Sequence, residues 1–374
     1  MFLACPVFAA ESATDSAAAL PDADVEEQRL AVAKKRLAGV AGRYPVTELS
    51  PGEEAAPAEA GRMLWRRAVS DVQEGNLDDR PLYWSRLAGR LAGRPDHPAS
   101  DPSRTRVRSF EYASRGFDDL RFPEAADTRR VLISGFDPFL LDRDIGQSNP
   151  SGLAALALDG MRLPVEKGWV WIEAVIFPVR YEDFDEGIVE SVLADALASH
   201  SIDLVVTISM GRDAFDLERF PGRRRSATAP DNRNVVTGAN ARTPLIPNLA
   251  GAPLEGPEFV EFSLPAAAMQ VIQSPWPVRD NRRVISLERG ELEPATLTEL
   301  SFDTAVQGSG GGYLSNEISY RSVLLLERMG AHVPVGHLHT PSVAGHDAVI
   351  EGRMLAQIRA LLTRAASALE GTSD

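Results

Sequence analysis

An alternation of apolar runs and helical stretches between residues 130 and 369 sets the strongest limit on the fold. Apolar, β-branched runs typical of buried strands occupy residues 130–134, 170–179, 202–209 and 333–339. Stretches with helical spacing of apolar residues occupy 151–158, 181–200, 263–274, 315–328 and 347–369. Strands that alternate with helices usually lie in a sheet that is covered on both faces. The pattern therefore predicts an α/β fold with a parallel or mixed central sheet.

The first 128 residues have a different pattern, and we expect three parts in the chain. Residues 1–24 combine an apolar segment at 2–10, which looks like the end of a secretory signal without its basic start, with a tether rich in Ala, Ser and Asp. An inert apolar N-terminus explains the segment equally well, so the compartment stays open between the cytoplasm and secretion or the periplasm, with a slight preference for secretion. Residues 25–128 predict a helical extension, with helices at 25–40, 58–74 and 82–91 and a polar linker at 95–104. Residues 129–374 form the predicted α/β domain.

Composition excludes several classes of partner and site. The net charge is −14, from 39 basic and 53 acidic residues, and such a chain repels nucleic acid unless it carries a strong basic patch. The three arginines at 223–225 are more typical of a surface turn. Cys5 is the only cysteine, so a disulfide within the chain, a cysteine-based metal site and a cysteine nucleophile in a catalytic context are all excluded. We expect no transmembrane segment, no cofactor and no metal.

Two segments place polar and aromatic residues directly after predicted strands. Residues 134–139 (SGFDPF), followed by Asn149, put two phenylalanines where open α/β sheets bind ligands, although both rings could simply belong to the core. Residues 211–219 place several carboxylates near the same sheet edge, which is a common arrangement after a strand.

Two further segments could supply a nucleophile and a base. Residues 308–317 are a glycine-rich loop that leads into a helix beginning at Ser315, where free backbone N–H groups can bind an oxyanion. Taken alone, Ser315 is more typical of a helix N-cap. His337 and His339 end a strand before Pro341. A zinc site is not indicated, because no acidic or cysteine partner lies at a useful spacing. An acid, a hydroxyl at a helix start and a histidine at a strand end are together the set that a hydrolytic triad needs.

The order of these motifs resembles that of the pyroglutamyl peptidase type I family. The motifs that carry the resemblance are Gly135 to Phe139, Asn149 to Ser151, Gly211-Arg212 with Glu218-Arg219, Pro230-Asp231-Asn232, Gly311 to Asn316 with Tyr320, and His339-Thr340-Pro341. The resemblance covers roughly the last two thirds of the chain. It implies a three-layer α/β/α fold of the phosphorylase/hydrolase-like kind and an exopeptidase that removes N-terminal pyroglutamate.

The resemblance also implies roles for individual residues. Glu218 corresponds to the catalytic acid of the family, His339 to the base and Ser315 to the nucleophilic cysteine. Phe136, Phe139 and Asn149 correspond to residues of the substrate pocket.

The chain departs from the family at two points. Serine replaces the thiol nucleophile, and a hydroxyl must lose its proton during attack, so the base has to be well aligned. The loop after residue 209 is also shorter and lacks the glutamine that recognises the lactam.

Three functions follow from these motifs. The first is a serine hydrolase with a Ser315–His339–Glu218 triad that acts on a peptide or an N-blocked amide. The second is an inactive binding or scaffold protein on the same fold, and the third is a hydrolase of another amide or ester with the helical extension as a lid. The oligomeric state stays open, and a homo-oligomer is compatible with the sequence.

Overall fold

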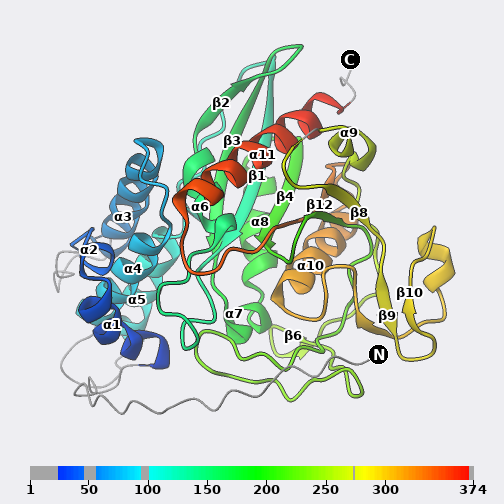
Figure 1. Ribbon diagram of the computed structural model, residues 1–374, viewed down its shortest axis with the longest axis horizontal. Helices are drawn as coiled ribbons and strands as arrows, with labels where there is room; N and C mark the ends of the chain where they lie inside the picture. The colour runs from blue at the N-terminus through cyan, green and yellow to red at the C-terminus, as the bar shows by residue number, and fades with distance from the viewer. Residues whose placement is uncertain (1–23, 46–55, 94–100, 273, 370–374) are drawn as a thin grey trace.

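A mixed seven-stranded sheet forms the centre of the protein in the computed structural model, which describes residues 24–45, 56–93, 101–272 and 274–369 (Figure 1). The strand order is β2-β3-β1-β4-β12-β5-β8. The strands β3, β1, β4 and β12 run parallel, whereas β2 is antiparallel to β3 and β5 is antiparallel to β12. The predicted α/β class with a mixed central sheet is confirmed. The signal-like segment and most of the tether lie outside the described residues.

The strands of the structure are short except for those near the centre of the main sheet. The main sheet consists of β1 (Thr128–Phe136), β2 (Met161–Pro164), β3 (Trp169–Phe177), β4 (Leu204–Met210), β5 (Phe215–Glu218), β8 (Val278–Asn281) and β12 (Val335–Thr340). Two small sheets consist of β6 (Asn248–Leu249) with β7 (Ala252–Pro253), and of β9 (Val284–Ser286), β10 (Gly290–Leu292) and β11 (Ala305–Gln307).

Helices cover both faces of the main sheet. The helices of the described chain are α1 (Val25–Arg36), α2 (Ala38–Ala41), α3 (Ala56–Gln73), α4 (Arg80–Ala92), α5 (Asp101–Ala113), α6 (Pro150–Leu158), α7 (Tyr181–Asp185), α8 (Ile188–Ser199), α9 (Ala266–Gln270), η1 (Leu297–Leu300), α10 (Leu314–Met329) and α11 (Ala348–Ser367). Helices α6 and α11 pack together on one face, and α8 and α10 pack together on the other. None of the described helices is both long and apolar enough to span a bilayer.

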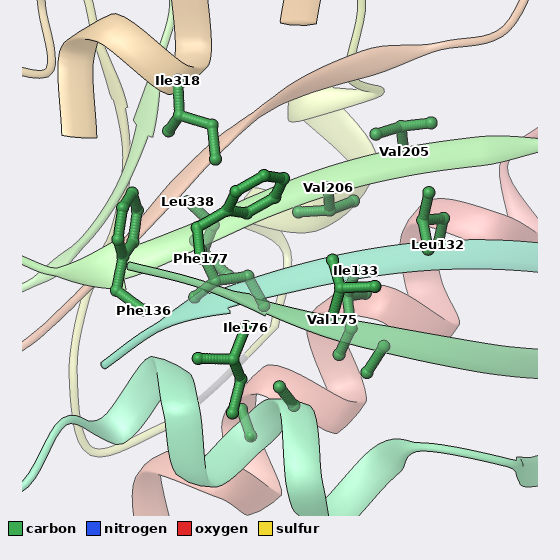
Figure 2. Close-up of a cluster of buried hydrophobic side chains, with 14 of the residues drawn as sticks. Leu132, Ile133, Phe136, Val175, Ile176, Phe177, Val205, Val206, Ile318 and Leu338 are labelled. Carbon is green, nitrogen blue, oxygen red and sulfur yellow. The ribbon is translucent and has the colours of Figure 1, made fainter. Parts of the chain in front are cut away.

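The core follows directly from the apolar strands that the sequence predicts. Ile133 of β1 pairs with Val206 of β4, and Val175 of β3 pairs with the next residue of β1. All three belong to the cluster of buried side chains in Figure 2 and have no exposed surface. Helix α6 packs very closely on β1, because a Cβ atom at Gly135 would lie 2.2 Å from the carbonyl oxygen of Ser151. Only glycine permits this approach, so Gly135 sets the position of α6 on the sheet.

The helical extension shares this core. Trp65 of α3, Leu82 of α4 and Phe110 of α5 belong to the same buried cluster as the sheet residues. Helices α1 to α5 lie together at one side of the sheet (Figure 1). The extension is therefore attached by apolar packing as well as by the chain.

Buried ion pairs also hold the extension. The carboxylate of Asp137, in the turn after β1, contacts Arg86 of α4 at 2.7 Å and Arg115, after α5, at 2.8 Å. The side chains of all three are at most 2% exposed. Arg86 also donates hydrogen bonds to the hydroxyl and the carbonyl oxygen of Ser114, and burial lowers the pKa of Arg86 to about 10. Charges this deeply buried are tolerated only when they are paired and hydrogen-bonded.

Several helix boundaries differ from the predicted ones. The helix predicted at 25–40 is interrupted at Leu37, after a basic last turn that favours a helix C-terminus. The helix predicted at 181–200 divides into α7 and α8 because Gly187 has a left-handed backbone, with φ of 86°. The helix predicted at 263–274 is only Ala266–Gln270.

Three segments contain regular structure that the sequence does not predict. Helix α5 begins at Asp101, inside the predicted linker at 95–104. Strand β5 lies within residues 211–219, and β8, β9 and β10 lie within residues 275–300, a polar stretch whose sequence shows no strand or helix pattern. These strands are three or four residues long, which is too short for a clear local pattern. β5 and β8 also pair with segments far away in the chain, whereas β9 and β10 pair with each other.

The buried pairs predict a large effect on stability. Arg86→Ala should lower the free energy of unfolding by roughly 3–5 kcal/mol, because it leaves Asp137 with one cation and Ser114 without its donor. Urea unfolding followed by circular dichroism measures this change. The control is Arg283→Ala, which removes an exposed 3.5 Å pair with Glu291 and should leave the unfolding midpoint nearly unchanged. Equal effects of the two substitutions would contradict the role given to the buried arginine.

Candidate functional site

A row of polar side chains crosses one face of the sheet over four neighbouring strands. His339 of β12 pairs with Ser209 of β4 on one side and with Asp216 of β5 on the other. Glu218, two residues after Asp216, pairs with Asn281 of β8. Side chains two residues apart on a strand point to the same face, so the register alone brings these groups together.

His339 and Glu218 form a buried hydrogen-bonded pair. The Nδ1 atom of His339 lies 2.6 Å from Oε1 of Glu218, and the Glu218 side chain is fully buried. The other carboxylate oxygen accepts a hydrogen bond of 2.7 Å from the Nδ2 of Asn281. Burial raises the pKa of Glu218, although His339 and Asn281 both oppose this rise. Within the described part of the chain, Nε2 of His339 has no hydrogen-bond partner, so this nitrogen is available to a ligand or a nucleophile.

Ser315 lies in the first turn of α10 but does not cap it. The helix begins at Leu314, and the cap residue is Tyr313, whose side chain makes no capping hydrogen bond. The hydroxyl of Ser315 donates instead to the carbonyl oxygen of Gly310, at 3.3 Å. The interpretation of Ser315 as an N-cap is therefore wrong, and the first N–H groups of α10 have no capping side chain.

The glycine-rich loop before α10 is fixed by Asn316. Its side chain donates to the carbonyl oxygen of Gly222 at 2.7 Å and accepts from the Gly222 N–H at 2.9 Å. A Cβ atom at Gly308 would lie 2.1 Å from the Asn316 side-chain oxygen. The loop can therefore run alongside Asn316 only with glycine at this position.

A small cavity of about 40 Å³ brings Ser315 together with the predicted pocket residues. Its lining residues are Phe136, Phe139, Asn149, Val179, Ser209, Met210, Tyr313, Leu314 and Ser315. The ring of Phe136 also stacks on Phe184, with centroids 6.2 Å apart, so its position is fixed by the core.

Asn149 has a structural role in addition to lining the cavity. It is the N-cap of α6, and its side-chain oxygen accepts from the backbone N–H of Ser151 at 3.1 Å. Its Nδ2 donates to the carbonyl oxygen of Asp137 at 3.0 Å. These hydrogen bonds join the two predicted motifs around residues 137 and 149. They also engage both the oxygen and the nitrogen of the Asn149 side-chain amide.

The predicted triad is only partly assembled. Glu218 and His339 are hydrogen-bonded, but among the described residues no hydrogen bond joins Ser315 to His339. His339 is not one of the residues that line the cavity, whereas its partner on the neighbouring strand, Ser209, is. Asn281 is the residue that sequence reasoning missed, because β8 has a single apolar residue and no strand pattern.

Comparisons with known proteins identify the family. Residues 130–283 and 291–344 match the family model described as PA0049, C-terminal domain. The chain belongs to this family. It is 29% identical over 402 residues to the uncharacterized protein PA0049 of Pseudomonas aeruginosa, and the match covers 82% of this chain and 72% of that protein. The matched family region contains all six predicted site residues and excludes helices α1 to α5.

Solved structures with a similar arrangement include two peptidases. Pyroglutamyl peptidase I of Bacillus amyloliquefaciens shares 18% identity, covers 64% of this chain and 97% of its own, and has a TM-score of 0.44. A mutant pyrrolidone carboxyl peptidase of Pyrococcus furiosus shares 20% identity, covers 64% of this chain and 100% of its own, and has a TM-score of 0.45.

The contact between Asn281 and Glu218 predicts a measurable pKa shift. Asn281→Ala should raise the pKa of Glu218 further, because the hydrogen bond that it removes stabilises the charged carboxylate. A carboxyl carbon titration by NMR measures the shift. Arg283→Ala, a substitution of the exposed residue just before β9, should leave the titration unchanged. A Glu218 pKa that stays constant or falls in Asn281→Ala would contradict this account.

Proposed function

We propose that the protein is a hydrolase in which Ser315 is the nucleophile, His339 the general base and Glu218 the group that orients the base. The proposed substrate carries an N-terminal pyroglutamate or a similarly blocked residue. The observation that carries the proposal is the 2.6 Å hydrogen bond between Glu218 and Nδ1 of His339, which leaves Nε2 of a buried imidazole without a partner. A carboxylate in this position holds the imidazole tautomer that can accept a proton at Nε2.

The cavity around Ser315 also supports the proposal. Ser315 lies at the uncapped start of α10, where the first-turn N–H groups can stabilise a developing oxyanion. Phe136 and Phe139 supply apolar walls for a small ring.

The proposed reaction has two steps. The oxygen of Ser315 attacks the substrate carbonyl carbon while its proton passes to Nε2 of His339, and the imidazolium then protonates the departing amine. Water attacks the resulting acyl-serine ester, with His339 as the base, and releases the acid and the free serine. The hydroxyl must turn from the carbonyl oxygen of Gly310 toward His339 when substrate binds, and catalytic hydrogen bonds often form only in that complex.

A scaffold protein is the second candidate. The hydrogen bond of Ser315 to Gly310 and the small cavity favour it, because neither feature by itself requires a reaction. A hydrolase of another amide or ester is a variant of the first candidate and is tested by the same substrates.

Activity and labelling distinguish these candidates. The wild type should release a chromogenic amine from a pyroglutamyl amide, and Ser315→Ala should reduce kcat at least about 10³-fold. A fluorophosphonate probe should label Ser315, and His339→Ala should prevent the labelling. The matched control is Ser301→Ala, which alters an exposed serine of the chain and should leave both readouts unchanged.

Three outcomes would contradict parts of the proposal. Labelling at another serine would remove Ser315 from its role. Hydrolysis of other amides or esters but not of pyroglutamyl amides would support the wider hydrolase. Inertness toward all of them, with no labelling, would support the scaffold protein.

A further inference from the structure

A second histidine lies beside the candidate triad and is not used by it. His337 is fully buried on β12, and its ring makes an edge contact with the ring of His339, with centroids 4.8 Å apart. Its Nδ1 lies 2.8 Å from the hydroxyl oxygen of Thr207, and its Nε2 lies 2.7 Å from the hydroxyl oxygen of Ser209. Both ring nitrogens are therefore occupied by hydroxyl groups of β4.

A carbonyl oxygen beside Thr207 favours one direction for these hydrogen bonds. The hydroxyl of Thr207 donates to the carbonyl oxygen of Gly336 at 3.3 Å, and a carbonyl oxygen can only accept. When Thr207 gives its single proton to this carbonyl oxygen, its own oxygen accepts from Nδ1–H of His337. Burial lowers the pKa of His337 well below its usual range, so the ring is neutral and carries a single proton. Nε2 is then an acceptor, and it takes the proton of the Ser209 hydroxyl.

The orientation of Ser209 matters because this residue lines the cavity. Its proton is directed at His337, so its oxygen offers only lone pairs to a bound ligand. The other polar side chains that line the cavity are engaged elsewhere: Tyr313 donates to the carbonyl oxygen of Pro230, Asn149 caps α6, and Ser315 donates to Gly310. The remaining lining residues are apolar.

We propose that Ser209 determines the specificity of the cavity, as a fixed hydrogen-bond acceptor that selects a ligand group bearing an N–H donor. This inference rests on the proposed function, because it assigns Ser209 to the binding of that substrate. A buried acceptor without a donor is costly, so a ligand in which a methyl group replaces the N–H is bound more weakly.

The first test measures the tautomer of His337 by nitrogen NMR on the full chain at neutral pH. We expect Nδ1–H in the wild type. Thr207→Val removes the acceptor for this proton without altering a cavity residue, and it should shift the ring toward Nε2–H. An Nε2–H tautomer in the wild type would overturn the proposal, because Ser209 would then be free to donate.

The second test compares two small ligands, 2-pyrrolidinone and N-methyl-2-pyrrolidinone, in NMR titrations of Ser315→Ala, which excludes turnover. 2-Pyrrolidinone should bind at least about fivefold tighter. Ser209→Ala and Thr207→Val should each reduce the preference to less than about twofold. The matched control is Ser134→Ala, which alters a buried serine on the neighbouring strand β1 that has no hydrogen-bond partner within the described chain, and it should keep the full preference.

The outcomes separate this inference from the proposed function. Equal binding of the two ligands, or no binding of either, overturns the specificity role of Ser209 even if pyroglutamyl amides are hydrolysed. Selective binding by a protein that hydrolyses nothing supports Ser209 as the selecting residue, and only the proposed catalysis fails.

Discussion

The candidate site depends on the insertion of β12 between two strands that follow each other closely in the chain. β4 ends at Met210 and β5 begins at Phe215, yet they are not neighbours in the sheet, because β12 lies between them and pairs with both. The hydrogen bond between His339 and Glu218 joins residues 121 positions apart. The row of polar side chains from Ser209 to Asn281 therefore forms only when β12, the last strand of the main sheet in chain order, has paired with β4 and β5.

The same insertion explains why two histidines of one strand have different surroundings. His337 faces Thr207 and Ser209 of β4, whereas His339 faces Glu218 of β5. One ring is held between two neutral hydroxyl groups and the other beside a buried carboxyl. The two histidines therefore have different hydrogen-bond partners, because β12 has a different strand on each side.

The helical extension holds the segment that carries the aromatic wall of the cavity. Asp137 lies between Phe136 and Phe139 in sequence, and its carboxylate is held by Arg86 and Arg115 of the extension. The position of the aromatic wall is therefore tied to helices that precede the matched family region. A lid formed by these helices is difficult to reconcile with charges this deeply buried, because opening would separate paired ions.

The sequence predicted the central strands and most helices because their apolar patterns are long and regular. The order of motifs singled out Phe136, Phe139, Asn149 and Ser315, which line the cavity, whereas their roles in binding and catalysis stay predictions. It did not single out the other lining residues, Ser209 among them. Strands β5 and β8 were missed because tertiary pairing, and not local pattern, makes them strands. The contacts of Asn281 and the hydrogen bond of Ser315 to Gly310 could not be predicted, because both depend on how separate elements are placed relative to each other.

The shared core has a practical consequence for anyone who wishes to work with a shorter version of this protein. Composition and the matched family region both suggest dividing the chain near residue 129, yet Trp65 and Phe110 are packed with the sheet and have no exposed surface. A fragment that begins at that point would expose a large apolar surface to water and would leave the Asp137 carboxylate without its two arginines. Such a fragment invites aggregation, and loss of activity in it would say nothing about whether the missing helices take part in chemistry.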